Sequence, residues 1–164
     1  MIDCWMQHGQ KDSQLIIRID IRSIYWLPGY QRDCVEIAAE FRPGNASQFG
    51  LKVRLSPDDA EHTRIVCDRA LGQLYVDRQR STLGYGEAEC QRFIALLPVE
   101  ADGTVRLRVF LDCSVLEVFA SSGACLTSRI YPSRADSLGL DLFATDGSAW
   151  LESLDVWAID SIGR

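Results

Sequence analysis

Asp77 and Arg78 are the residues best suited to hold a ligand, and they close an alternating run that begins at Gln73. A carboxylate accepts hydrogen bonds and a planar guanidinium donates several, so the pair could bind two neighbouring hydroxyl groups. The longest irregular stretch of the chain, residues 78–90, follows directly and predicts a flexible surface loop. The sequence leaves a second interpretation open, in which these two side chains form a local ion pair that pins the loop.

Glu117 is a carboxylate in an apolar setting, because Val115 and Phe119 flank it on one face of a predicted strand at residues 115–120. It could accept a hydrogen bond from a ligand hydroxyl or lie at a contact between domains. Alternatively, it is a core carboxylate paired with an arginine such as Arg108 or Arg129. An unpaired buried carboxylate costs several kcal/mol, so a partner is expected in either interpretation.

Three further charged residues, Glu40, Lys52 and Arg54, lie on the polar faces of neighbouring predicted strands. They could extend a binding patch that includes Asp77 and Arg78. Charged residues on a sheet are usually solvated, and these three could equally be ordinary surface residues.

The sequence contains no arrangement typical of nucleophilic or metal chemistry. His8 and His62 are far apart and have no partnered serine or cysteine motif. The six cysteines include no Cys-x-x-Cys pair and lie near no histidine cluster, so the spacing supports no zinc site. We therefore predict no catalytic residue, no metal and no cofactor, and we expect most cysteines to be reduced core residues.

The candidate residues must be positioned by β-strands, because apolar and polar residues alternate through most of the chain. About eleven strands are predicted, at residues 15–21, 35–41, 49–55, 63–68, 73–77, 91–96, 105–111, 115–120, 124–131, 138–143 and 149–159. So many strands bury their apolar faces best in two stacked sheets. The sequence thus predicts an all-β, two-sheet antiparallel β-sandwich and no helix.

Local signals predict how some of these strands are connected. Residues 35–41 and 49–55 are expected to be antiparallel neighbours. Residues 27–30, Leu-Pro-Gly-Tyr, are expected to form a turn, because proline and glycine interrupt strands. Residues 145–148, Thr-Asp-Gly-Ser, carry the signal of a hairpin turn.

Length and charge limit the classes of partner. A chain of 164 residues suits one domain, and we expect a sandwich at residues 15–164 preceded by an extension or linker remnant at residues 1–14. The net charge of −6 and the pI near 4.9 argue against a nucleic-acid partner. No apolar run is long enough for a membrane span, and no signal peptide is recognised, which favours a cytoplasmic location.

Residues 107–159 closely resemble the C-terminal β-sandwich domain of glycoside hydrolase family 32, the family of invertases, levanases and inulinases. Weaker similarity occurs at residues 37–41, 49–54 and 74–78, so the resemblance covers most of the chain. Carbohydrate-binding modules of family 66, which recognise fructose ends, are also similar. The resemblance implies a sandwich of the jelly-roll or concanavalin-like type.

The resemblance also implies that catalysis takes place elsewhere. In that family the catalytic groups come from a β-propeller with the motifs Asn-Asp-Pro-Asn-Gly, Arg-Asp-Pro and Glu-Cys-Pro. This chain has Arg32-Asp33-Cys34 and Glu89-Cys90-Gln91, both without the proline, and nothing like the first motif. We therefore expect that the chain alone is not an enzyme.

Three functions follow from the resemblance. The chain could be an accessory module that binds fructan or a fructose-terminated sugar, and the residues expected to bind it are Glu40, Arg54, Asp77, Arg78 and Glu117. It could instead be a structural domain that packs on a catalytic β-propeller and stabilises it. The third and least favoured function is that of an intact small glycoside hydrolase with an unrecognised site.

Overall fold

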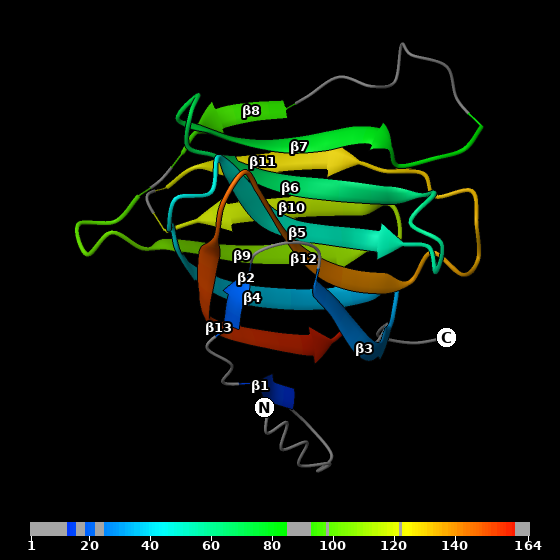
Figure 1. The fold of residues 1–164 in the computed structure, drawn as a ribbon. Coiled ribbons are helices and arrows are strands. Elements are labelled where there is room, and N and C mark those ends of the chain that lie inside the picture. The colour runs from blue at the N-terminus through cyan, green and yellow to red at the C-terminus, as the bar shows by residue number, and fades with distance from the viewer. Residues whose placement is uncertain are drawn as a thin grey trace.

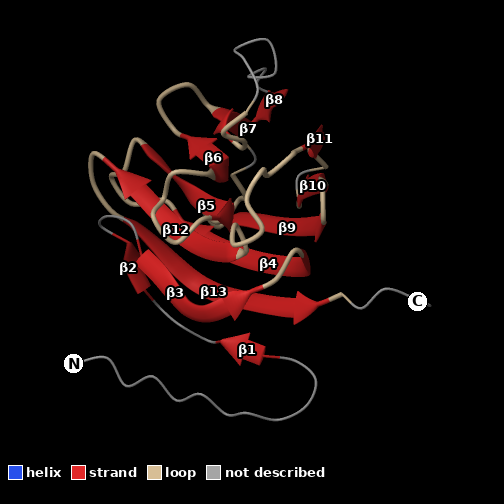
Figure 2. Ribbon diagram, turned by 90° about the vertical axis from the view of Figure 1, so that its right-hand side faces the viewer, coloured by secondary structure: helices blue, strands red, loops and turns tan. Residues whose placement is uncertain are grey.

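A computed structural model of the chain describes residues 13–15, 19–21, 25–84, 93–97, 99–121 and 123–159. All the regular secondary structure within these residues is β-strand, and the thirteen strands form two antiparallel sheets (Figure 1). The two sheets pack face to face, as the view turned by 90° shows (Figure 2). The predicted all-β sandwich is confirmed.

The first sheet has seven strands in the order β1-β13-β4-β9-β10-β11, with β2 also paired to β13. These strands are β1 (Ser13–Leu15), β2 (Ile19–Ile21), β4 (Cys34–Arg42), β9 (Val105–Asp112), β10 (Val115–Ala120), β11 (Cys125–Arg129) and β13 (Ala149–Ala158). The second sheet has six strands in the order β3-β12-β5-β6-β7-β8. These strands are β3 (Tyr25–Gln31), β5 (Gln48–Leu55), β6 (His62–Asp68), β7 (Gln73–Arg80), β8 (Phe93–Leu96) and β12 (Gly139–Thr145).

All eleven predicted strands are present, and two differences raise the number to thirteen. The strand predicted at residues 15–21 is described as two short strands, β1 and β2. The turn predicted at residues 27–30 is wrong, because β3 runs through these residues. Pro28 lacks the N–H that a central strand must donate, but among the described strands β3 lies at the edge of its sheet and pairs with β12, and an edge strand tolerates proline.

Two predicted pairings are also wrong. β4 and β5 are not neighbours, and the turn at residues 145–148 does not close a hairpin, because in both cases the chain crosses from one sheet to the other. The alternation of apolar and polar residues predicts which side chains face the core, but it does not predict which strands are neighbours in a sheet. The hairpins β6–β7, β9–β10 and β10–β11 do join neighbouring strands.

The two crossing segments are bonded to each other. The amide of Ala46 donates to the carbonyl of Ser148 at 3.0 Å, and the amide of Ser148 donates to Asn45 Oδ1 at 2.8 Å. The amide of Ser47 donates to the carbonyl of Thr145 at 2.9 Å. These bonds hold the two connections side by side and satisfy part of their backbone hydrogen-bonding capacity.

The core lies between the sheets and follows the alternation of the sequence. In β4, Val35, Ile37, Ala39 and Phe41 are buried, and the intervening residues are only partly buried. Phe41 meets Phe49 of the other sheet with ring centroids 5.5 Å apart. A fully buried phenylalanine contributes about 1.5–3 kcal/mol through apolar burial, so this contact helps to fix one sheet on the other.

Two further predictions concern the start of the domain and a possible membrane span. β1 begins at Ser13 and pairs with β13, and the domain boundary at residue 15 stays a prediction. None of the described residues belongs to a helix that is long and apolar enough to cross a membrane.

Candidate functional site

A pocket of about 320 Å³ lies on the face of the six-stranded sheet that points away from the core. We call it the outer-sheet pocket. Its lining comes from β5, β6, β7, β12 and the β5–β6 turn, and consists of Lys52, Asp59, His62, Arg64, Asp77, Gln79, Arg80, Phe143, Ala144 and Thr145. Its volume is at the lower end of the range found for small-molecule sites.

Strand register places three charged residues of the pocket in one row. Lys52 of β5 lies opposite Arg64 of β6, and Arg64 lies opposite Asp77 of β7. Residues directly opposite one another project to the same face of a sheet. Three residues far apart in the sequence therefore line one side of the pocket.

The first charged pair in the row is Arg64 and Asp77. Arg64 Nη2 lies 2.7 Å from Asp77 Oδ2, and the backbone amide of Gln79 donates to Asp77 Oδ1 at 3.0 Å. The Asp77 side chain is only 3% exposed, whereas that of Arg64 is 28% exposed. The carboxylate thus holds the guanidinium in place, and the guanidinium faces the pocket.

The second charged pair is Lys52 and Asp59. Lys52 Nζ donates to Asp59 Oδ1 at 2.7 Å, and the buried Lys52 side chain is covered by its neighbours. His62 Nδ1 lies 2.9 Å from the same oxygen. Burial and the nearby Lys52 ammonium lower the pKa of His62, although the Asp59 carboxylate opposes this shift.

An aromatic ring forms the apolar part of the pocket. Phe143 belongs to a small outer cluster with Val66 and Tyr75, and the Arg64 guanidinium lies 5.5 Å from the Phe143 ring centroid. Gly50 lies opposite Phe143 on β5 and provides the space for this packing. The pocket therefore offers one apolar surface next to donors and acceptors.

A buried carboxylate braces the turn that carries Asp59. Glu61 accepts hydrogen bonds from the Ser133 hydroxyl at 2.6 Å and from the amides of Ser133 and Arg134 at 2.7 and 3.1 Å. Burial alone would raise the pKa of Glu61, but these bonds and one from Ser137 lower it. Arg134 also donates to Asp58 at 2.7 Å, which ties the loop at residues 130–138 to the β5–β6 turn.

This arrangement is suited to binding rather than to nucleophilic chemistry. Its lining includes neither serine nor cysteine, so His62 has no such nucleophile there to activate. Arg64, Arg80 and Gln79 supply donors, Asp59 supplies an acceptor, and Phe143 supplies a ring face. Such a set can exchange hydrogen bonds with polar groups of a ligand while an apolar part of the ligand packs on the ring.

The structure separates the two residues predicted as an adjacent binding pair. Asp77 lines the pocket, but Arg78 points to the opposite face of β7. Arg78 Nη1 donates to the carbonyl of Arg129 on β11 at 2.8 Å, and its guanidinium lies 5.2 Å from the Phe93 ring centroid. The carboxylate that Asp77 offers forms an ion pair with Arg64 of the neighbouring strand.

The other predicted binding residues lie away from the pocket. Glu40 is on the outer face of the seven-stranded sheet, 3.1 Å from Arg106. Glu117 is on the same sheet, where it lies opposite Phe110 and Thr127, and Arg108, one of its expected partners, contacts Glu36 instead. Arg54 follows Lys52 by two residues but lies 3.8 Å from Asp33, outside the pocket lining.

Sequence reasoning missed most of the pocket. Asp59, Arg64, Gln79, Arg80 and Phe143 come from four separate segments, and Lys52 was only considered as a possible extension of the patch. The alternation already placed Arg64 and Asp77 on the polar faces of two strands joined by a tight turn. Pairing those strands across the turn would have predicted the ion pair.

Comparison with known proteins agrees with the fold. A family model described as "Glycosyl hydrolases family 32 C terminal" matches residues 7–158. A levanase of Bacillus subtilis is 36% identical over 142 residues, which cover 83% of this chain and 20% of the levanase. A sucrose-6-phosphate hydrolase of Zymomonas mobilis is 31% identical over 130 residues, covering 76% of this chain and 24% of that protein.

A solved structure of exo-inulinase from Aspergillus awamori superposes with a TM-score of 0.78 and 25% sequence identity. The superposition covers 93% of this chain and 29% of the exo-inulinase. The chain thus spans only about a fifth to a third of the length of these similar proteins.

Proposed function

Since this chain belongs to the glycosyl hydrolase family 32 C-terminal domain family, we propose that it is a non-catalytic accessory β-sandwich that binds a fructose-terminated sugar. The outer-sheet pocket is the proposed binding site. The observation that carries the proposal is the row Lys52, Arg64 and Asp77 beside the Phe143 ring.

The chemistry of the pocket supports a sugar rather than another ligand. Arg64 and Arg80 can donate to vicinal hydroxyls, and Asp59, whose side chain is 41% exposed, can accept from them. The volume of about 320 Å³ suits a single sugar ring better than a long segment of chain. A terminal fructose unit of a fructan meets both requirements, and similarity to a levanase and an exo-inulinase supports this choice.

The outer-sheet pocket is proposed to bind the sugar without hydrolysing it. A glycoside hydrolase needs two carboxyl groups on either side of the scissile bond, one of them able to give a proton. In the outer-sheet pocket, Asp77 is held by Arg64, and Asp59 is held by Lys52. We therefore expect sugar binding without release of fructose.

Isothermal titration calorimetry with levan, inulin, sucrose and fructose tests the proposal. We expect heat of binding with the fructose-terminated ligands, and we expect Arg64→Gln to weaken the affinity at least about tenfold by removing a charged hydrogen bond. Arg106→Gln is the matched control, because Arg106 forms a similar ion pair on the other sheet. Its affinity should equal that of the unchanged protein.

The thermal unfolding midpoint of both variants shows whether the fold is intact. If neither a fructan nor fructose produces heat of binding with the folded protein, the proposal that this chain binds sugar is wrong. If Arg64→Gln and Arg106→Gln bind equally well, binding takes place outside the outer-sheet pocket.

A second function, packing on a catalytic β-propeller, is favoured by a different observation. The edge strand β8 and the β6–β7 turn beside it expose several large apolar side chains, including Leu71, Ile94 and Leu96, and Leu96 is 83% exposed. Exposed apolar patches of this kind commonly mark protein interfaces. Co-purification of the chain with a family 32 propeller produced separately, lost in the Ile94→Ser, Leu96→Ser double variant, would support packing at this edge.

A further inference from the structure

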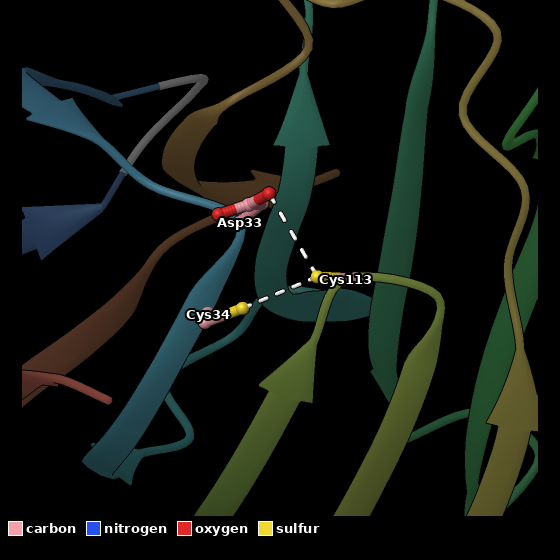
Figure 3. Close-up of side chains that lie close together, drawn as sticks. All are labelled: Asp33, Cys34 and Cys113. Carbon is pink, nitrogen blue, oxygen red and sulfur yellow. Dashed lines mark hydrogen bonds between the residues drawn. The ribbon is translucent and has the colours of Figure 1, made fainter. Parts of the chain in front are cut away.

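Cys34 and Cys113 bring two thiols into direct contact at the end of the seven-stranded sheet. Cys34 is the first residue of β4, and Cys113 is in the two-residue turn between β9 and β10. Their sulfur atoms are 3.3 Å apart, and the Cys113 thiol also lies 3.8 Å from Asp33 Oδ2 (Figure 3). Only Cys67 among the four described cysteines is a core residue, so the prediction that most cysteines are core residues is wrong for these.

The backbone directs Cys113 toward Cys34. Cys113 has a φ of 50°, in the left-handed region that turns usually reserve for glycine. Its amide donates to the carbonyl of Asp33 at 2.9 Å, which holds the turn against the start of β4. A side chain kept in such a conformation by its surroundings is often associated with a functional site.

We propose that Cys34 and Cys113 are a site of reversible oxidation, at which a small-molecule disulfide converts the two thiols into an intramolecular disulfide. The cross-link joins the start of β4 to the β9–β10 turn. It lies outside the lining of the outer-sheet pocket, and the inference does not depend on sugar binding.

The exposures of the two thiols set the order of the reaction. Cys113 is exposed and meets the oxidant first, whereas burial raises the pKa of the half-buried Cys34 thiol to about 12, and its hydrogen bond with Cys113 adds to this. The Cys113 sulfur, after giving its proton to solvent, attacks the small disulfide, forms a mixed disulfide and releases one thiolate. The Cys34 sulfur then loses its proton, attacks the Cys113 sulfur and releases the second thiolate. The two protein thiols thus lose two electrons and two protons, and the oxidant becomes two thiols.

The geometry favours a disulfide over a metal ion at this position. Asp33, Cys34 and Cys113 offer three ligand atoms within 4.8 Å of one another. However, two thiolates bound 2.3 Å from a tetrahedral zinc ion are about 3.8 Å apart, and the sulfurs here are closer. In addition, Asp33 already lies 3.8 Å from the Arg54 guanidinium, whose charge opposes a cation.

The test incubates the full chain with oxidised glutathione and follows it by intact mass, peptide mapping and thermal unfolding. In the peptide map we expect a cross-linked peptide that contains Cys34 and Cys113 and has lost two hydrogen atoms, and we expect a rise in Tm of roughly 5–15 °C, since the disulfide closes a long loop. Dithiothreitol should reverse both changes.

Two variants identify the reacting residues. Cys34→Ser should leave Cys113 with one bound glutathione, because the resolving thiol is gone, and should abolish the rise in Tm. Cys125→Ser is the matched control, since Cys125 is also exposed but has no described thiol neighbour, and it should form the cross-link normally. Two outcomes would overturn the proposal: free Cys34 and Cys113 thiols after oxidation of the folded chain, or a stoichiometric zinc ion that protects both from oxidation.

Discussion

Glu61 is a single residue on which the shape of the outer-sheet pocket depends. It is fully buried, and the bonds from Ser133, Ser137 and Arg134 lower its pKa even though burial opposes this. A carboxyl group whose pKa is lowered by folding stabilises the folded protein at pH values above its pKa in the unfolded chain, which is about 4.3 for glutamate. This contribution disappears as the pH falls through the pKa of the folded state.

We therefore predict that Glu61→Gln lowers the free energy of unfolding at pH 7 by about 1.5–3 kcal/mol, the range for charged hydrogen bonds. The difference between the two proteins should shrink as the pH falls below about 4.3. Urea unfolding at pH 7 and at pH 3 measures both. Glu40→Gln, which removes an ion pair at the surface, should change the free energy by less than about 1 kcal/mol. A constant difference at both pH values would contradict the account of Glu61.

At the scale of single residues, the sequence could identify charged side chains but not their partners. Asp77 and Arg78 are adjacent, and neighbouring residues of a strand point to opposite faces. The alternation that predicted β7 therefore also separates the two, and it places Asp77 beside Arg64. The position of Arg54 outside the pocket could not be predicted either. It depends on a φ of 52° and on the irregular β5–β12 register, and neither can be inferred from the sequence.

Among the strands, β5 depends on the absence of a side chain at Gly50. A Cβ atom there would overlap the carbonyl oxygen of Ile65 on β6, and φ is 152°. Because the obstacle is backbone, relief requires the two strands to move apart. The outer-sheet pocket spans both strands, so its floor would move with them.

We predict that Gly50→Ala lowers the free energy of unfolding by about 3 kcal/mol or more, since the native conformation is incompatible with a side chain. Gly84→Ala is the control, because a Cβ atom at Gly84 would meet nothing within 4 Å, and it should change stability by less than about 0.5 kcal/mol. Thermal and urea unfolding of both variants provide the measurement. Equal effects at the two glycines would show that the close approach of β5 and β6 is unimportant.

The strands themselves were predictable because alternation is strong, but the sheet to which each belongs was not. β4 and β5 follow each other closely and still lie in different sheets, because burying an apolar face requires a facing layer rather than a particular neighbour. β3 was missed for a local reason, since Pro28 and Gly29 are typical of turns and only its place at the edge allows a strand.

For the whole molecule, the strand order makes most pairings distant in sequence. β4 pairs with β9 and β13, and β5 pairs with β12. Closing such long loops costs entropy before the contacts form, which slows the folding of β-sandwiches into the millisecond-to-second range. We predict that stopped-flow refolding, followed by tryptophan fluorescence, has its main phase in this range. Complete refolding within microseconds would contradict the topology.

The position of β4 has a consequence for synthesis in the cell. β4 ends at Arg42, but the strands that cover its two sides begin at Val105 and Ala149. At translation rates of about 5–20 residues per second, a ribosome needs roughly 3–13 s to reach the first of them and roughly 5–21 s to reach the second. During that interval the nascent chain carries a partly apolar strand segment whose backbone groups have no neighbouring strand on either side. We expect chaperones that shield such segments to bind it.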